Sequence, residues 1–125
     1  IYAVEPEDFD DMKRSLESGV HQRNDDKARS ICDAILTPTP GALTFPVNQS
    51  NGVQGLAVSD DEVLAAMAFA LNELKMVIEP GGAVCLAALL AGRVDVTGQT
   101  VVAVVSGGNA DPAMLTRALD WTATL

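Results

Sequence analysis

The chain has 125 residues, of which 48% are hydrophobic and 20% charged, and its formal net charge is -9. This length is enough for one domain with a real core, and the hydrophobic content excludes an intrinsically disordered chain. The negative charge argues against nucleic acid or an anionic membrane surface as the partner, and no apolar run approaches the roughly 20 residues needed to span a bilayer.

The first half of the chain alternates between strand-like and helix-like segments. Residues 1–4 are apolar and predict a strand, which Pro6 ends because proline cannot continue a ladder of hydrogen bonds. Residues 7–19 predict a helix that begins with acidic residues and closes at Gly19, as the helix dipole and a left-handed cap favour. Next come a surface loop at 20–30 that holds the only histidine, His21, an irregular loop at 37–41, a short helix at 42–50 and a strand at 53–58.

The second half begins with a capping box. The hydroxyl of Ser59 is placed to accept from the amide of Glu62, so we expect a helix from there to about Met76. The run Glu79-Pro80-Gly81-Gly82 is predicted to break the chain, and residues 83–91, small and apolar nearly all round, then predict a buried helix.

Residues 100–111 predict a buried strand, a glycine-rich turn and a helix N-terminus in succession. Five of the first six residues are apolar, and the turn Ser106-Gly107-Gly108-Asn109 follows. Asp111 and Pro112 suit the N-cap and first position of a helix extending over 111–125. Such junctions bind ligands in many α/β proteins, although an ordinary tight turn has the same local pattern.

Taken together, the order of elements predicts an α/β fold with three αβα layers and a mostly parallel sheet. Glu5, Glu79 and Ser106 each adjoin an apolar segment; singly they suit ordinary structural roles, but jointly they favour one crevice. The acidic residues of 5–11 are typical either of a solvated helix start or of a hard divalent-cation site. Cys32 and Cys85 have no metal-type spacing and favour reduced, buried thiols in a cytoplasmic protein.

Four motifs give the chain its resemblance to a known family. They are V-E-P-E-D-F-D-D at 4–11, I-C-D-A-I-L-T-P-T-P-G at 31–41, V-I-E-P-G-G-A-V at 77–84 and V-V-S-G-G-N-A-D at 104–111. In order and spacing they resemble the C-terminal part of threonine/serine dehydratases, fold type II pyridoxal-phosphate enzymes related to serine racemase. The resemblance implies that residues 1–125 form a single partial domain, the C-terminal portion of the large catalytic domain.

The resemblance also implies roles for individual residues. Ser106 would hydrogen-bond the pyridine nitrogen of pyridoxal phosphate, which suits β-elimination. Glu79 would lie beside the cofactor, with Ala34 against its ring, and Thr37 would lie near the substrate. The remaining implied positions are Gly107 for the cofactor, and Glu5, Asp11 and the carbonyl of Phe9 for Mg or Ca.

Two features of the family are missing from this sequence. Lys13, Lys27 and Lys75 all lack the sequence context of the family's Schiff-base lysine, and the glycine-rich phosphate loop is absent. We therefore expect no catalytic residue in this chain and no activity from the chain alone. It would be part of a homo-oligomeric enzyme that converts L-threonine or L-serine to a 2-oxo acid and ammonia.

Other functions remain open at this stage. On the same scaffold, a serine racemase or a 3-hydroxyaspartate ammonia-lyase would differ in substrate contacts that these residues do not include. A non-catalytic ligand-binding or regulatory module is a separate class, whereas a purely structural domain would not require Ser106, Glu79 and Glu5 in these settings.

Overall fold

A computed structural model describes residues 1–121 of the chain. In this part, strands β1 (Tyr2–Pro6) and β2 (Gln54–Val58) pair in parallel, with Tyr2 opposite Gln54 and Pro6 opposite Val58. The helical elements are, in chain order, the 3-10 turn η1 (Glu7–Phe9), α1 (Asp11–Ser18), the 3-10 turn η2 (Asp33–Ile35), α2 (Thr44–Ser50), α3 (Asp60–Phe69), the π-helical turn η3 (Ala70–Leu74), α4 (Pro80–Leu90) and α5 (Pro112–Leu119).

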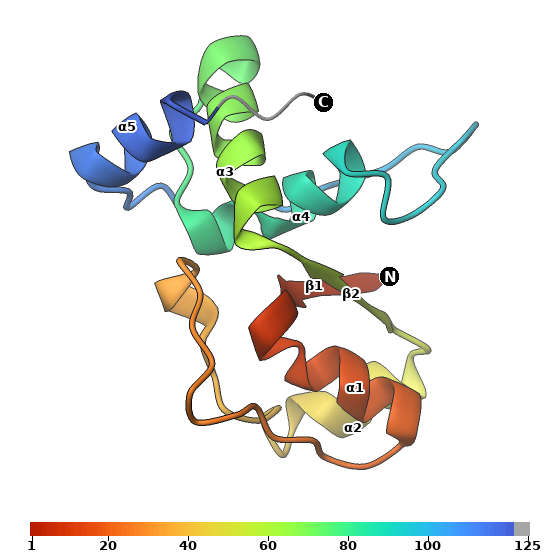
Figure 1. The fold of residues 1–125 in the computed structure, drawn as a ribbon. Coiled ribbons are helices and arrows are strands. Elements are labelled where there is room, and N and C mark those ends of the chain that lie inside the picture. The colour runs from red at the N-terminus through yellow and green to blue at the C-terminus, as the bar shows by residue number, and fades with distance from the viewer. Residues whose placement is uncertain (122–125) are drawn as a thin grey trace.

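The elements form three layers around the small sheet (Figure 1). Helix α1 contacts both strands on one side and carries α2 beside it, while α4 contacts both strands on the other side. Helix α3 packs on α4 and also contacts α5. The predicted α/β class, with helices on both faces of a parallel sheet, is therefore confirmed.

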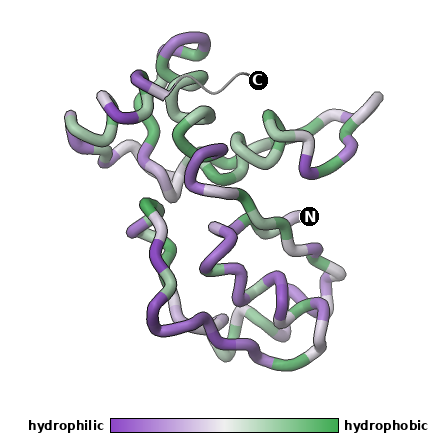
Figure 2. Tube along the Cα trace, viewed as in Figure 1, coloured by the Kyte–Doolittle hydropathy of each residue, from purple (hydrophilic) through white to green (hydrophobic). Residues whose placement is uncertain are grey.

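The core lies between the sheet, α3 and α4. Figure 2 shows hydrophobic residues along β2 and α4, whereas the loop after α1 is mostly hydrophilic. Val58, Val63, Ala83 and Ala87 are fully buried, and Leu64 is nearly so. Helix α4 is buried on most of its surface because its small apolar residues let α3 and the strands approach closely. No helix within residues 1–121 has the length and hydrophobicity to cross a membrane.

The local signals for helix ends are confirmed. The Ser59 hydroxyl accepts from the Glu62 amide while the Glu62 carboxylate accepts from the Ser59 amide, which completes the capping box. Asp111 caps α5 by accepting from the Met114 amide at 2.7 Å. Gly19 ends α1 with a φ of 77°, a left-handed conformation in which glycine is favoured.

Several predicted helix boundaries differ from the structure: the helix predicted over 7–19 is divided into η1 and α1, and the one predicted to Met76 ends at Phe69 and continues as η3. The sequence predicts a chain break at the run from Pro80 to Gly82, but this run forms the first turn of α4, with Glu79 as the N-cap residue. Proline is accommodated there because the first helical amide has no intrahelical acceptor. The helix predicted over 111–125 extends to Leu119, and residues 122–125 lie outside the described residues.

The predicted buried strand at 100–105 is wrong for this structure. The segment has no strand pairing, and Val101, Val102 and Val104 are 42%, 85% and 66% exposed. It lines an apolar groove of about 370 Å³ together with residues of β1. A strand requires a neighbouring ladder, and β1 pairs only with β2 among the described residues, so hydrophobicity alone does not place this segment in the sheet.

Helix α1 lies unusually close to β2 at Gly55. A Cβ atom built on Gly55 would lie 2.3 Å from the Cα of Lys13 and 2.4 Å from its Cβ. Backbone atoms cannot move aside as a flexible side chain can, so this contact requires glycine in the strand.

We predict that Gly55→Ala destabilises the protein by about 1–3 kcal/mol because the added methyl group pushes α1 away from β2. Urea unfolding monitored by circular dichroism measures this change. Gln54→Ala, at the exposed neighbouring position, is the matched control and should stay within about 0.5 kcal/mol of the wild type. Equal stabilities for Gly55→Ala and the wild type would contradict the close packing.

Candidate functional site

Glu79 joins the start of α4 to the turn at residues 106–109. Its amide donates to the carbonyl of Gly107 at 3.0 Å, and its carboxylate Oε2 accepts from the amide of Asn109 at 2.8 Å. A hydrogen bond to a carboxylate is stronger than one between neutral groups. Since both the backbone and the side chain of Glu79 take part, they fix how far the turn lies from the start of α4 and how it is oriented.

Glycines allow these two segments to come together. A Cβ atom on Gly107 would lie 2.5–2.7 Å from the Glu79 carboxyl group, and one on Gly82 would lie 2.8 Å from the Gly107 carbonyl oxygen. On the other side of the α4 N-terminus, a Cβ on Gly81 would lie 3.4 Å from the Cβ of Ala34. The structure therefore brings together four residues from the sequence prediction: Ser106, Gly107, Glu79 and Ala34.

The side chain of Ser106 is available to a ligand. Ser106 is exposed, and its hydroxyl has no hydrogen-bond partner within residues 1–121, although the adjacent Gly107 is held by Glu79. Ala34 and Thr37 are also exposed, in and just after η2. An exposed hydroxyl on a turn that Glu79 fixes can hydrogen-bond a polar group of a ligand.

Thr37 is positioned by a residue that the sequence analysis did not identify. Its carbonyl oxygen accepts from the side-chain amide of Asn24 at 2.9 Å, and Asn24 is only 5% exposed. In the sequence Asn24 stands in a charged, polar loop, where nothing distinguishes a buried asparagine from a solvated one. Only the folded position of the loop reveals its role.

The predicted cation ligands lie at the junction of β1 and α1. The carboxylate of Glu5 accepts from the amides of Met12 and Lys13 at 3.1 and 2.9 Å, and Asp11 accepts from the side chain of Asn24 at 2.6 Å. Burial raises the pKa of Glu5 to about 7, with repulsion from Asp11 as a smaller cause. Burial also raises the pKa of Asp11.

These carboxylates have structural partners of their own. In the part of the chain that the structure describes, no group of three or more His, Cys, Asp or Glu side chains is arranged to hold a metal ion. Two carboxylates and one backbone carbonyl are hard oxygen donors, so a cation bound here would need water molecules as further ligands.

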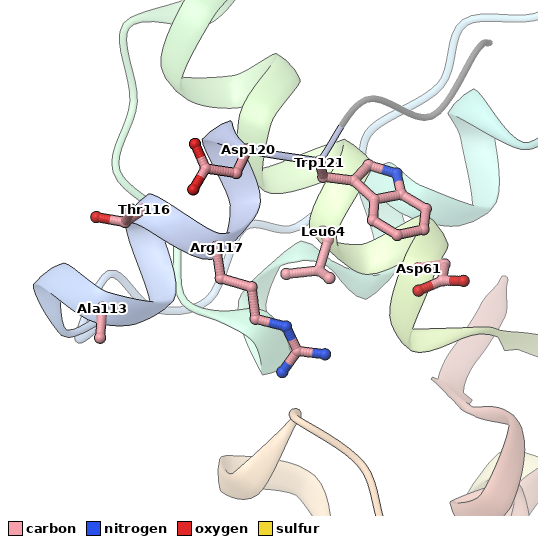
Figure 3. Close-up of a pocket in the computed structure, with 7 residues that line it drawn as sticks. All are labelled: Asp61, Leu64, Ala113, Thr116, Arg117, Asp120 and Trp121. Carbon is pink, nitrogen blue, oxygen red and sulfur yellow. The ribbon is translucent and has the colours of Figure 1, made fainter.

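A separate pocket lies between α3 and α5 (Figure 3). It has a volume of about 420 Å³, and Arg117, Asp120 and Asp61 contribute charged groups to its lining. Figure 3 shows Arg117 extending from α5 beside Leu64. None of the predicted site residues lines this pocket. The pocket is therefore distinct from the turn that carries Ser106.

The remaining reactive side chains are not gathered at this turn. Lys13 pairs with Glu17 at 2.9 Å, Lys75 donates to the carbonyl of Asn72, and Lys27 is exposed. His21 is exposed, as predicted, and its ring packs edge-on against Phe45 with centroids 4.5 Å apart. Cys32 and Cys85 are both free thiols, and burial raises the pKa of each.

A family model, curated relatives and solved structures all match this chain to the same family. Residues 1–107 match the family model described as pyridoxal-phosphate dependent enzyme. The L-threo-3-hydroxyaspartate ammonia-lyase of Pseudomonas sp is 40% identical over 111 residues, which cover 89% of this chain and 34% of that protein. The L-threonine ammonia-lyase of Thermotoga maritima is 35% identical over 120 residues, covering 96% of this chain and 29% of that protein.

Solved structures agree with the sequence matches. A threonine deaminase from T.th. superposes with a TM-score of 0.79 at 39% identity, covering 88% of this chain and 40% of that chain. The serine racemase of Dictyostelium discoideum gives a TM-score of 0.78 at 37% identity, covering 88% of this chain and 35% of that chain. The chain therefore spans about a third of the length of the curated relatives it matches.

We predict that Gly107→Ala destabilises the protein by about 1–3 kcal/mol, because the new methyl group overlaps the Glu79 carboxylate. Urea unfolding measures the loss. In the Glu79→Ala background the overlap is gone, so the same substitution should then have a smaller effect. An equal effect in both backgrounds would contradict the contact.

Proposed function

Because this chain belongs to the family of pyridoxal-phosphate-dependent enzymes, we propose that it supplies one wall of the cofactor site of a threonine/serine ammonia-lyase. That enzyme would convert L-threonine or L-serine to a 2-oxo acid and ammonia. The observation that carries the proposal is the exposed Ser106 hydroxyl on a turn that Glu79 fixes to the start of α4. The names of the relatives support this reaction class.

The residues at this turn fit the cofactor chemically. The Ser106 hydroxyl would hydrogen-bond the pyridine nitrogen, and the exposed Ala34, whose small side chain lies beside Gly81, would lie against the ring. When bound, pyridoxal phosphate supplies the electron sink for the reaction. A neutral serine partner leaves the ring less electron-withdrawing than a carboxylate partner would, which suits β-elimination.

The chain would not complete the site alone. Lys13 pairs with Glu17, Lys75 donates to the carbonyl of Asn72, Lys27 is exposed, and none of the three stands near Ser106 in the sequence. We therefore assign the lysine that binds the cofactor, and the phosphate loop, to the rest of the polypeptide. Catalysis is a property of that longer enzyme, and this chain by itself would be inactive.

Related reactions are the alternatives. L-threo-3-hydroxyaspartate ammonia-lyase and serine racemase are names of relatives that match this chain about as well. Thr37 is exposed beside the proposed ring site and would face the substrate, but one threonine does not distinguish a methyl, a hydroxymethyl and a carboxylate group. A non-catalytic binding module remains the alternative from a different class.

The test is an assay of the full-length polypeptide with pyridoxal phosphate and L-threonine, L-serine or 3-hydroxyaspartate. We expect a 2-oxo acid and ammonia from the first two. We expect Ser106→Ala to lower turnover and weaken cofactor binding by about tenfold or more, equivalent to about 1.4 kcal/mol. Unchanged cofactor affinity and turnover in Ser106→Ala would remove the role of this residue, and a wild type without any turnover would favour the non-catalytic module.

We further propose that Glu5, Asp11 and the Phe9 carbonyl bind Mg or Ca. The carboxylate of Asp11 is buried, that of Glu5 is half-buried, and the two repel each other, so a divalent cation between them would relieve that repulsion. Their hydrogen bonds to amides leave lone pairs free, because each carboxylate oxygen has two.

Asp11→Asn keeps the acceptor for Asn24 but removes one charge, so we predict that it abolishes stabilisation by added cation. In the wild type, a cation at 100 times its Kd raises stability by about 2.7 kcal/mol, which a melting curve detects. Asp8→Asn, at an exposed acidic position nearby, is the control and should keep the full effect. A melting temperature of Asp11→Asn that rises with Mg or Ca as in the wild type would exclude this site.

A further inference from the structure

Asn24 is a buried polar residue in a loop without regular secondary structure. Its exposure is 5%, although it lies between α1 and η2 in a segment rich in charge. A buried amide side chain is costly unless its donors and acceptor are all paired. The hydrogen-bond partners of Asn24 therefore indicate which role this buried side chain has.

Every polar group of the Asn24 side chain is paired. Its Nδ2 donates to Oδ1 of Asp11 at 2.6 Å and to the carbonyl of Thr37 at 2.9 Å. Its Oδ1 accepts from Nη2 of Arg14 at 2.5 Å. The opposite amide orientation would place oxygen against two acceptors, so the network permits only this one.

The loop at residues 37–39 depends on this connection. The amide of Asn24 donates to the Pro38 carbonyl at 2.9 Å, and the Thr39 hydroxyl donates to the Gln22 carbonyl at 2.8 Å. Within residues 1–121, these bonds and the one to Thr37 are the only hydrogen bonds that join residues 37–39 to other segments. Pro38 and Pro40 have no amide to contribute, so the loop cannot build a ladder of its own.

The segment 22–24 is in turn fixed to α1. The amide of Gln22 donates to the Ser15 hydroxyl at 2.8 Å, and Arg14 donates to the carbonyl of Arg23 at 3.3 Å. Ser15 and Asp11 are almost fully buried, so these contacts anchor the segment to a rigid helix. Residues 22–24 thus form a strap that links α1 to the 37–39 loop.

We propose that Asn24 is a positioning residue for substrate binding, which sets the place of Thr37 from the first turns of α1. This inference rests on the proposed function, in which Thr37 faces the substrate. Asn24 touches neither Ser106 nor Glu79, so it acts on the substrate side of the site and leaves the cofactor-ring side alone. Asn24 then holds the substrate side of the site at Thr37, and Glu79 independently holds the cofactor side at Ser106.

The test uses the full-length polypeptide and the variant Asn24→Ala, with Gln22→Ala as the matched control. Among residues 1–121, the Gln22 side chain hydrogen-bonds only to the exposed Ser18 hydroxyl, and the Gln22 backbone carbonyl still accepts from Thr39 in the variant. In Asn24→Ala we expect about tenfold faster hydrogen exchange in peptides spanning residues 37–41 of the cofactor-free protein. With pyridoxal phosphate bound, KM for the amino-acid substrate should rise about tenfold, while the cofactor Kd stays within about twofold.

Thr39→Val provides a second route if Asn24→Ala does not fold. It removes the other side-chain bond of the loop, so exchange of residues 37–41 and KM should change in the same direction by a smaller factor. Unchanged loop exchange in either folded variant would overturn the proposal, as would a cofactor Kd that rises in step with KM. A wild type that turns over no amino acid would reject the proposed function, whereas the exchange data would still decide whether the strap holds the loop.

Discussion

The hydrogen bonds between Glu79 and the 106–109 turn hold the centre of the candidate site. They join two segments that are far apart in sequence, the N-terminus of α4 and the turn before α5. The segment that leads into this turn has no strand pairing, so a sheet does not fix it. Glu79 supplies the missing constraint through its backbone amide and its carboxylate, and it orients Ser106 as a result.

Close approach of backbones is the second requirement of this structure. Gly107 and Gly82 let the turn lie against Glu79, Gly81 lets α4 lie against Ala34, and Gly55 lets α1 lie on β2. A methyl group would block the contacts at Gly55, Gly82 and Gly107, because protein interiors leave little space for displacement, whereas one on Gly81 would lie at ordinary van der Waals distance from Ala34.

Buried polar side chains hold the segments that have no regular structure. The side chain of Asn24 pairs all its polar groups with Asp11, Arg14 and Thr37, and the half-buried carboxylate of Glu5 accepts from two amides in the first turn of α1. The loop that Asn24 holds is rich in proline, and it carries the threonine proposed to face the substrate. A loop that cannot form its own hydrogen bonds must obtain its position from neighbours.

The sequence by itself determined the features that depend on local chemistry: the capping box at Ser59, the cap of α5 at Asp111, the left-handed end of α1 at Gly19 and the α/β class. These follow from contacts within a few residues, which adjacent side chains specify. Only the tertiary structure decided that residues 100–105 lack a strand partner and that Asn24 is buried. Pairing and burial depend on segments that are distant in sequence, and a local pattern carries no information about where those segments come to lie.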